Sequence, residues 1–219
     1  MNSTTARRLR TLVLGVAACA ALGACAPLLM GGALVGGTMV ATDRRTSGAM
    51  LEDEGIEVKA SGRIREALGD RGNVSVTSYN RVVLLTGDVP TEADKATAER
   101  VTLGVENAQS VVNEIVVGLA RSFISRSRDG LLTSKVKASF IDARDVFSNS
   151  IKVVTSHQVV YLMGRVTERE AHRAAEIARG VDGVQKVVRV FEIISEAELA
   201  NQLPSPKPAP AAASAPSKP

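Results

Sequence analysis

The sequence predicts an α+β protein made of two tandem copies of one small module, each with the element order α-β-β-α-β. Three observations predict this fold. Two stretches about 76 residues apart resemble each other, both contain runs of alternating apolar and polar residues, and segments with helical spacing of apolar residues flank those runs. A chain of 219 residues leaves room for two such modules, each with its own small core.

The duplication is clearest in one strand and the helix that follows it. VVLLTGDV (82–89) matches VVYLMGRV (159–166) at five of eight positions. TEADKATAERVTLGVENAQSVV (91–112) matches TEREAHRAAEIARGVDGVQKVV (167–188) at eight of 22 positions, with Pro90 as the only insertion between the two blocks. Agreement this dense, with a single gap, indicates an internal duplication.

The same elements are expected in each module, in the same order. For the first module, residues 46–118, these are a helix over 50–68, a hairpin over 73–89 with a polar turn at Ser78–Asn80, a helix between Thr91 and Gly104, and a strand over 111–117. For the second module, residues 124–195, they are a helix over 131–143, a hairpin over 150–166 with its turn near Ser156 and His157, a helix between Thr167 and Gly180, and a strand over 187–194.

The second helix of each module has an N-terminal capping signal. Thr167 and Glu170 have the spacing of a capping box, and Thr91 with Asp94 is a weaker counterpart. The glycines after these helices should adopt the left-handed conformation that ends many helices. Small residues spaced to share one face should let the later helix lie close to the sheet: Ala171, Ala174, Ala175 and Ala178.

The N-terminus has the layout of a secretory signal peptide. A positively charged stretch, residues 1–10, precedes an apolar run over 11–22 that is too short for a stable transmembrane helix. We therefore expect residues 1–24 to be a signal peptide that is removed on export. Cys19 would leave with it, so the exported chain would contain no disulfide.

Cys25 directly follows this segment and is the expected site of lipidation. Leu22-Gly23-Ala24-Cys25 resembles the bacterial lipobox, in which the cysteine sulfur takes a diacylglyceryl group. Val16-Ala17-Ala18-Cys19 fits the same pattern, but its apolar run is shorter. The alternatives are an ordinary signal peptide with an incidental cysteine and a buried N-terminal helix. In lipoproteins of this kind, Ala26 rather than Asp after the cysteine implies the outer membrane, with the body of the protein in the periplasm.

Two low-complexity segments flank the modules. Residues 25–45 are rich in glycine and apolar residues and are expected to be a flexible lipidated tether. Residues 196–219 are expected to be a disordered Pro/Ala-rich tail, since 204–219 holds six of the eight prolines.

Taken together, these features resemble the BON domain, and the whole chain resembles the dual-BON lipoproteins of the bacterial outer membrane. The matching features are the hairpin glycines Gly87 and Gly164, the "TE" that opens the second helix, and the closing stretches GVENAQSVVN and GVDGVQKVVR. The resemblance covers nearly everything from Cys25 to about Ile194. It implies that the protein supports envelope integrity and collects at sites of cell division.

Candidate catalytic, metal-binding and cofactor-binding residues are not apparent in the sequence, so we expect no enzyme and no cofactor. His157 and His172 have no partners at metal-ligand spacing and are interpreted as exposed polar residues. The adjacent acids Glu52-Asp53-Glu54 are interpreted as the solvated start of a helix. The formal charge of +4 falls to about +1 without the three N-terminal arginines (4 − 3), which disfavours nucleic-acid binding.

The first helix of the second module is the candidate binding surface. Leu132, Val136 and Phe140 should face the sheet, whereas Leu131 lies about a hundred degrees away, near Lys135. Exposed leucine beside cations suits an anionic lipid surface. Packing of Leu131 against the neighbouring module, with the lysines solvated, is the other interpretation.

The family resemblance favours the lipid interpretation. It implies that the second module binds anionic phospholipid, and it assigns the contact to Leu131, Lys135 and Lys137. Some family members carry an aromatic residue where this chain has Leu131. The alternative function is a protein-binding scaffold that docks an outer-membrane assembly or a division complex through the surface between the modules or through the final strands.

Overall fold

The computed structural model describes residues 43–143, 146 and 148–202. The described residues from Arg44 onward belong to one compact unit. The expected signal peptide 1–24, Cys25, the tether up to residue 42 and residues 203–219 of the expected tail lie outside the described residues. No helix among the described residues is long and apolar enough to cross a membrane.

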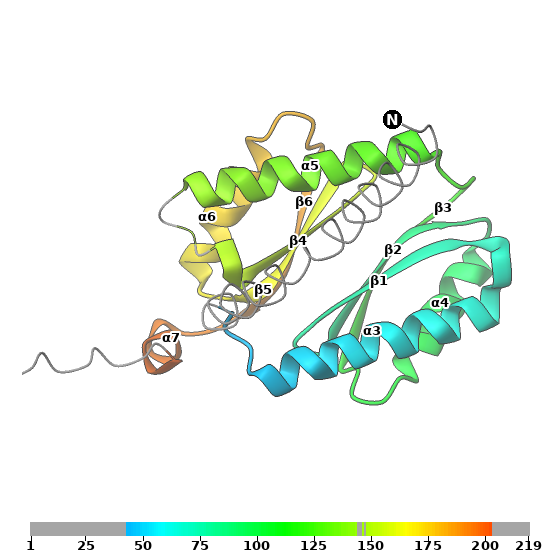
Figure 1. Ribbon diagram of the computed structural model, residues 1–219, viewed down its shortest axis with the longest axis horizontal. Coiled ribbons are helices and arrows are strands. Elements are labelled where there is room, and N and C mark those ends of the chain that lie inside the picture. Colours follow the sequence, from blue (N-terminus) through cyan, green and yellow to red (C-terminus); the bar gives the residue numbers. More distant parts are fainter. Residues whose placement is uncertain (1–42, 144–145, 147, 203–219) are drawn as a thin grey trace, which may run out of the picture. The chain divides into compact units, whose positions relative to one another are not determined.

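Each domain has two helices on one face of a three-stranded sheet, which confirms the predicted α+β architecture (Figure 1). The first domain consists of α3 (Ser47–Leu68), a 3-10 turn η1 (Gly69–Arg71), β1 (Asn73–Tyr79), β2 (Val82–Val89), α4 (Glu92–Leu103) and β3 (Ser110–Val117). The second consists of α5 (Phe123–Asp142), η2 (Ser148–Ser150), β4 (Ile151–Ser156), β5 (Val159–Val166), α6 (Glu168–Arg179) and β6 (Lys186–Ile193), and α7 (Glu196–Gln202) follows it.

The two sheets have the same topology. The central strand, β2 or β5, pairs antiparallel with the strand before it and parallel with the last strand of its domain. The helix between the parallel strands makes the crossover that a parallel pair requires.

Both faces of the central strands are buried, which explains their nearly continuous apolar sequence. Val83 and Leu85 on β2 face the helices of their own domain. Because side chains alternate along a strand, Leu84 points to the opposite face, where it joins a buried cluster with Tyr161 and Met163 of β5. The two sheets therefore share a core on the faces that their own helices leave uncovered.

The hairpin turns are tighter than the sequence suggests and lie one residue later than expected. Asn80 and Arg81 form the first turn, with φ of 48° and 68°, and His157 and Gln158 form the second, with φ of 55° and 60°. Two successive residues with positive φ are characteristic of the type I′ turn that joins two-residue hairpins. Because neither turn contains glycine, both are strained and need support from outside the hairpin.

The predicted N-terminal caps of the second helices are confirmed. The Thr167 hydroxyl accepts a hydrogen bond from the Glu170 N–H, and the Glu170 carboxylate accepts one from the Thr167 N–H at 2.9 Å, a complete capping box. The prediction of left-handed glycines was wrong. Gly104 and Gly180 end the helices with φ of −78° and −74°, and the positive φ values lie three residues later, at Asn107 and Gly183.

Two predicted boundaries differ from the structure. α5 begins at Phe123 rather than at residue 131, because Ser122 caps it by accepting a hydrogen bond from the Ser125 N–H. The segment expected to be a disordered tail from residue 196 begins with α7. Leu199 in that helix is 7% exposed, so its burial stabilises the short helix.

Candidate membrane-binding surface

Helix α5 packs against its sheet with one apolar side. Leu132, Val136 and Phe140 are 6%, 0% and 1% exposed, which confirms that they face the sheet. Their spacing of four residues places them on one face of the helix. The opposite face of α5 is therefore turned to solvent.

That solvent face carries exposed apolar side chains, which we call the apolar stripe: Phe123, Ile124, Leu131 and Ile141. They are 65–76% exposed. Ile124 and Leu131 are seven residues apart and so lie on the same side of the helix, about 10 Å apart along its axis. Leu131 is 66% exposed, so most of its side chain is open to solvent.

Basic side chains flank the apolar stripe on both sides. Arg128 and Lys135 lie on one side, and Arg126 and Lys137 lie on the other; all four are exposed. The side chains of Arg128, Lys135 and Lys137 form no ion pair or hydrogen bond with another residue that the structure describes. The two lysines that the sequence predicted thus lie on opposite flanks of Leu131 and are free to meet anions.

A buried carboxylate fixes the orientation of α5. Asp129, 5% exposed, accepts hydrogen bonds from the N–H groups of His157 and Gln158 at 3.0 and 2.9 Å. It also pairs with Arg121, which in turn contacts Asp88 of the first domain at 3.2 Å. Because the hairpin turn holds the helix at this point, α5 cannot easily rotate to bury the stripe.

The first domain repeats this arrangement with Asp53, and the prediction that Asp53 is solvated was wrong. Asp53 is 2% exposed and accepts hydrogen bonds from Ser78 Oγ at 2.6 Å and from the N–H groups of Asn80 and Arg81 at 2.7 and 2.8 Å. Burial alone would raise the pKa of Asp53, but these hydrogen bonds, together with one from Arg45, lower it below its ordinary value.

The histidines differ from one another in their surroundings. His172 is 67% exposed, as predicted. His157 was expected to be exposed, but its side chain is only 25% exposed and its Nε2 lies 2.8 Å from Asp88 Oδ1. No group of three His, Cys, Asp or Glu side chains within the described residues could hold a metal ion.

An open pocket of about 570 Å³ adjoins the apolar stripe. Three segments form its walls: the N-terminal half of α5, the turn between β4 and β5, and the loop between α6 and β6. The side chains that line it include Arg128, Leu131, Lys135, Gln158 and Gln185. Leu131 belongs both to this pocket and to the stripe.

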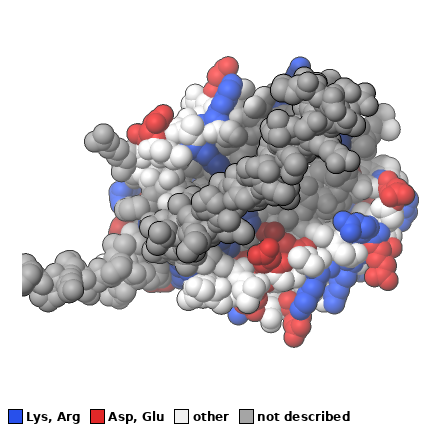
Figure 2. All heavy atoms as spheres, viewed as in Figure 1, with Lys and Arg blue, Asp and Glu red and all other residues white. Residues whose placement is uncertain are grey.

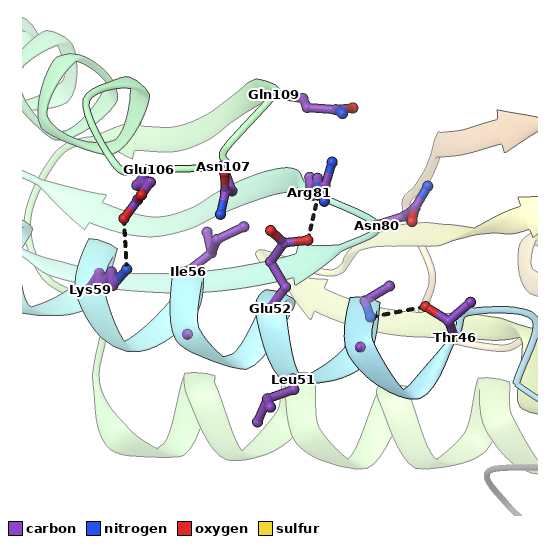
Figure 3. A pocket seen from close by; sticks show the side chains of 13 residues that line it. Thr46, Leu51, Glu52, Ile56, Lys59, Asn80, Arg81, Glu106, Asn107 and Gln109 are labelled. Carbon is purple, nitrogen blue, oxygen red and sulfur yellow. Dashed lines mark hydrogen bonds and ion pairs between the residues drawn. The ribbon is translucent and has the colours of Figure 1, made fainter.

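The first domain has a pocket of about 820 Å³ in the equivalent place, between α3, the turn at Asn80 and the loop before β3 (Figure 3). Two ion pairs cross it. Arg81 lies 2.6 Å from Glu52, and Lys59 lies 3.4 Å from Glu106. Where this pocket has Gly55, the second domain has Leu131.

Charges of both signs lie side by side on the face of the molecule that Figure 2 shows, outside its grey atoms. A nucleic-acid-binding protein usually presents a continuous basic face. The cations flanking the stripe are thus a local feature of α5.

Comparison with known proteins agrees with the duplicated architecture. The BON domain model matches residues 52–118 and again 128–195. The chain belongs to the BON-domain family. It is 37% identical over 189 residues to the outer membrane lipoprotein DolP of Haemophilus influenzae, an alignment that covers 85% of this chain and 97% of DolP. This confirms the predicted dual-BON type and supports placing the chain among outer membrane lipoproteins.

Two further relatives show the same relationship over a shorter length. The 21 kDa hemolysin of Actinobacillus pleuropneumoniae is 30% identical, covering 69% of this chain and 79% of the hemolysin. The osmotically-inducible protein Y of Escherichia coli is 33% identical, covering 69% and 77%. None of these names describes an enzyme.

Proposed function

We propose that this protein is a lipid-anchored outer membrane lipoprotein whose second BON domain binds anionic phospholipid through helix α5, and that it thereby supports envelope integrity without catalysing a reaction. One observation supports the proposal above the others. The solvent face of α5 carries four exposed apolar side chains flanked by cations, which is the pattern of an interfacial membrane helix.

The apolar and the electrostatic contributions act together. Side chains of the size of Leu131 and Phe123 would enter the boundary between headgroups and acyl chains, each contributing on the order of 1 kcal/mol when partly buried. Each Lys or Arg near an anionic surface contributes about 1 kcal/mol. Association costs at least about 4 kcal/mol, so the isolated domain should bind weakly and only to membranes that carry negative charge.

The proposed anchor compensates for that weakness. Acyl chains on Cys25 would hold the domains beside the membrane and raise the local concentration of α5 at its surface. An outer membrane location with the domains in the periplasm fits the expected sorting signal at Ala26. In this arrangement the anchor retains the protein, and α5 orients the domains against the lipid.

Vesicle flotation of the chain lacking residues 1–25 tests the proposal. We expect it to float with vesicles that contain phosphatidylglycerol or cardiolipin and to stay in solution with phosphatidylcholine vesicles. Leu131→Glu should reduce flotation, because it places a carboxylate at the centre of the stripe. Leu51→Glu is the matched control, since Leu51 is 75% exposed on α3, the equivalent helix of the first domain.

Equal binding to neutral vesicles, or equal loss in both variants, would contradict the proposal. If the protein instead docks other proteins, the purified chain should stay in solution with every kind of vesicle. That result would also contradict the proposed lipid binding.

A further inference from the structure

The two pockets beside α3 and α5 are equivalent parts of the duplicated fold. Asp53 and Asp129 bind the hairpin turn in the same way in both domains, which fixes the structural alignment of the two helices. In that alignment Lys59 corresponds to Lys135 and Gln109 to Gln185, and all four residues line their pockets. The two pockets therefore share one backbone arrangement and differ in the side chains that line them.

One substitution reverses a charge. Glu52 in the first domain corresponds to Arg128 in the second. Glu52 pairs with Arg81, and in the second domain Gln158 stands in place of Arg81. The exchange removes the carboxylate and adds a guanidinium, and the acid that remains at the turn, Asp129, is already paired with Arg121.

Two of the three cations that line the second pocket consequently have no partner, whereas the third, Arg121, pairs with Asp129. Neither Arg128 nor Lys135 forms an ion pair with any residue that the structure describes, whereas Lys59, the counterpart of Lys135, pairs with Glu106 at 3.4 Å. Asp182 replaces Glu106 in the second pocket, but its side chain is one methylene shorter and makes no ion pair there. The first pocket is neutralised internally, whereas in the second the unpaired Arg128 and Lys135 outnumber the unpaired carboxylate of Asp182, which leaves an excess of one positive charge for an anion.

We infer that the pocket beside α5 binds the phosphate ester of a single anionic lipid headgroup, an inference that rests on the proposed function. Arg128 offers paired N–H donors that match phosphate oxygens, and Lys135 adds a second positive charge. The amide groups of Gln158 and Gln185 hydrogen-bond to each other at 3.3 Å, and their remaining N–H groups can donate to the hydroxyls of a glycerol headgroup. A volume of about 570 Å³ lies within the range of roughly 300–1,000 Å³ that is usual for small-molecule sites.

The position of the pocket fits this ligand. Leu131 forms part of its wall and also belongs to the stripe proposed to enter the membrane. A headgroup in the pocket would thus lie at the level of the phosphates while Leu131 reaches the acyl chains. The second domain would then bind a specific lipid headgroup, in addition to being attracted to the negative charge of the membrane surface.

Titration in the absence of a membrane tests the pocket separately from the stripe. The probe is sn-glycero-3-phosphoglycerol, the soluble headgroup of phosphatidylglycerol, added to the ¹⁵N-labelled chain lacking residues 1–25. We expect saturable NMR shifts of the backbone amides of Gln158, Gly183 and Gln185. The first domain provides an internal control, because Arg81, Asn107 and Gln109 line the equivalent pocket and should not shift.

A matched pair of variants places one carboxylate in each pocket. Gln185→Glu should weaken binding of the probe about three- to fivefold, the effect of one exposed like charge, whereas Gln109→Glu should leave it unchanged. Both side chains are exposed, so both variants should fold. Equal effects of the two substitutions would overturn the assignment.

Further outcomes separate this inference from the proposed function. Inorganic phosphate that binds as tightly as the glycerol ester would show a free-anion site and overturn the headgroup assignment. Flotation with anionic vesicles without saturable shifts would overturn the pocket and leave the membrane surface standing. Saturable shifts without flotation would support the pocket and refute the proposed membrane binding.

Discussion

Replacement of Asp53 by Asn should destabilise the first domain although the side chain keeps its shape. Each carboxylate oxygen accepts two hydrogen bonds: Oδ1 from Ser78 and the Arg81 N–H, and Oδ2 from the Asn80 N–H and Arg45. An amide retains one oxygen and turns an NH2 group toward the other two donors. Two buried donors then lose their acceptor, at about 1–3 kcal/mol each.

The expected loss is about 3 kcal/mol in the free energy of unfolding, because the strained turn has no glycine to relieve it. Urea denaturation followed by circular dichroism measures this loss, with the m-value showing whether the domains unfold together. Glu54→Gln is the control, since Glu54 is the exposed neighbour on the same helix and should change stability by less than about 0.5 kcal/mol.

The effect should also depend on pH. The folded-state pKa of Asp53 lies below its ordinary value of 3.8, so the stability it contributes is fully present above pH 4 and is lost as the pH falls through the folded-state pKa. The difference between the wild type and Asp53→Asn should therefore shrink below pH 4. A loss smaller than about 1 kcal/mol at pH 7, or a difference that is constant down to pH 2, would refute the role assigned to Asp53.

Three further predictions concern the fold and the anchor. Gly87→Ala should prevent folding of the first hairpin, because a Cβ at φ 124° would collide with the Asn73 carbonyl, whereas Gly55→Ala, with open space around it, should be neutral or stabilising in a thermal melt. Phe140→Ala should cost the second domain about 3–5 kcal/mol in urea denaturation, since Phe140 is 1% exposed in its core; a loss below about 1 kcal/mol would mean that the core repacks. Cys25→Ala should release the exported protein from the membrane fraction, and unchanged retention would contradict lipidation at Cys25.

The fold was predictable because the duplication presents the same sequence pattern twice in one chain. Alternating strands, the capping box at Thr167 and the alanine face of α6 depend on local sequence spacing, and all three are confirmed. The start of α5 was not predicted, because few of the eight residues after Ser122 are buried. The helical spacing of core residues is therefore not visible in this part of the sequence. A serine preceding Phe123 was the available signal.

The candidate surface was predictable in part. Leu131 stood out because it lies beside residues that must face the core. Phe123 and Ile124 were missed together with the first two turns of α5. The burial of Asp53 was missed because it lies between two other acidic residues, and such clusters are usually exposed to solvent. The signal was Asp129 at the equivalent position of the second domain, which indicates that both copies need a carboxylate there. The pockets depend on how three separate segments converge, which no local pattern specifies.

The depth of a spin label on α5 tests the membrane-binding surface most directly. The chain lacking residues 1–25 contains no cysteine, so Ser134→Cys on the exposed face of α5 can carry a single nitroxide, and Val58→Cys places one at the equivalent position of α3. With phosphatidylglycerol vesicles, the label at residue 134 should become accessible to oxygen and shielded from a water-soluble relaxation agent, while the label at residue 58 stays in water. If both labels remain in water, or if both enter the lipid, the result would contradict membrane binding through the exposed face of α5.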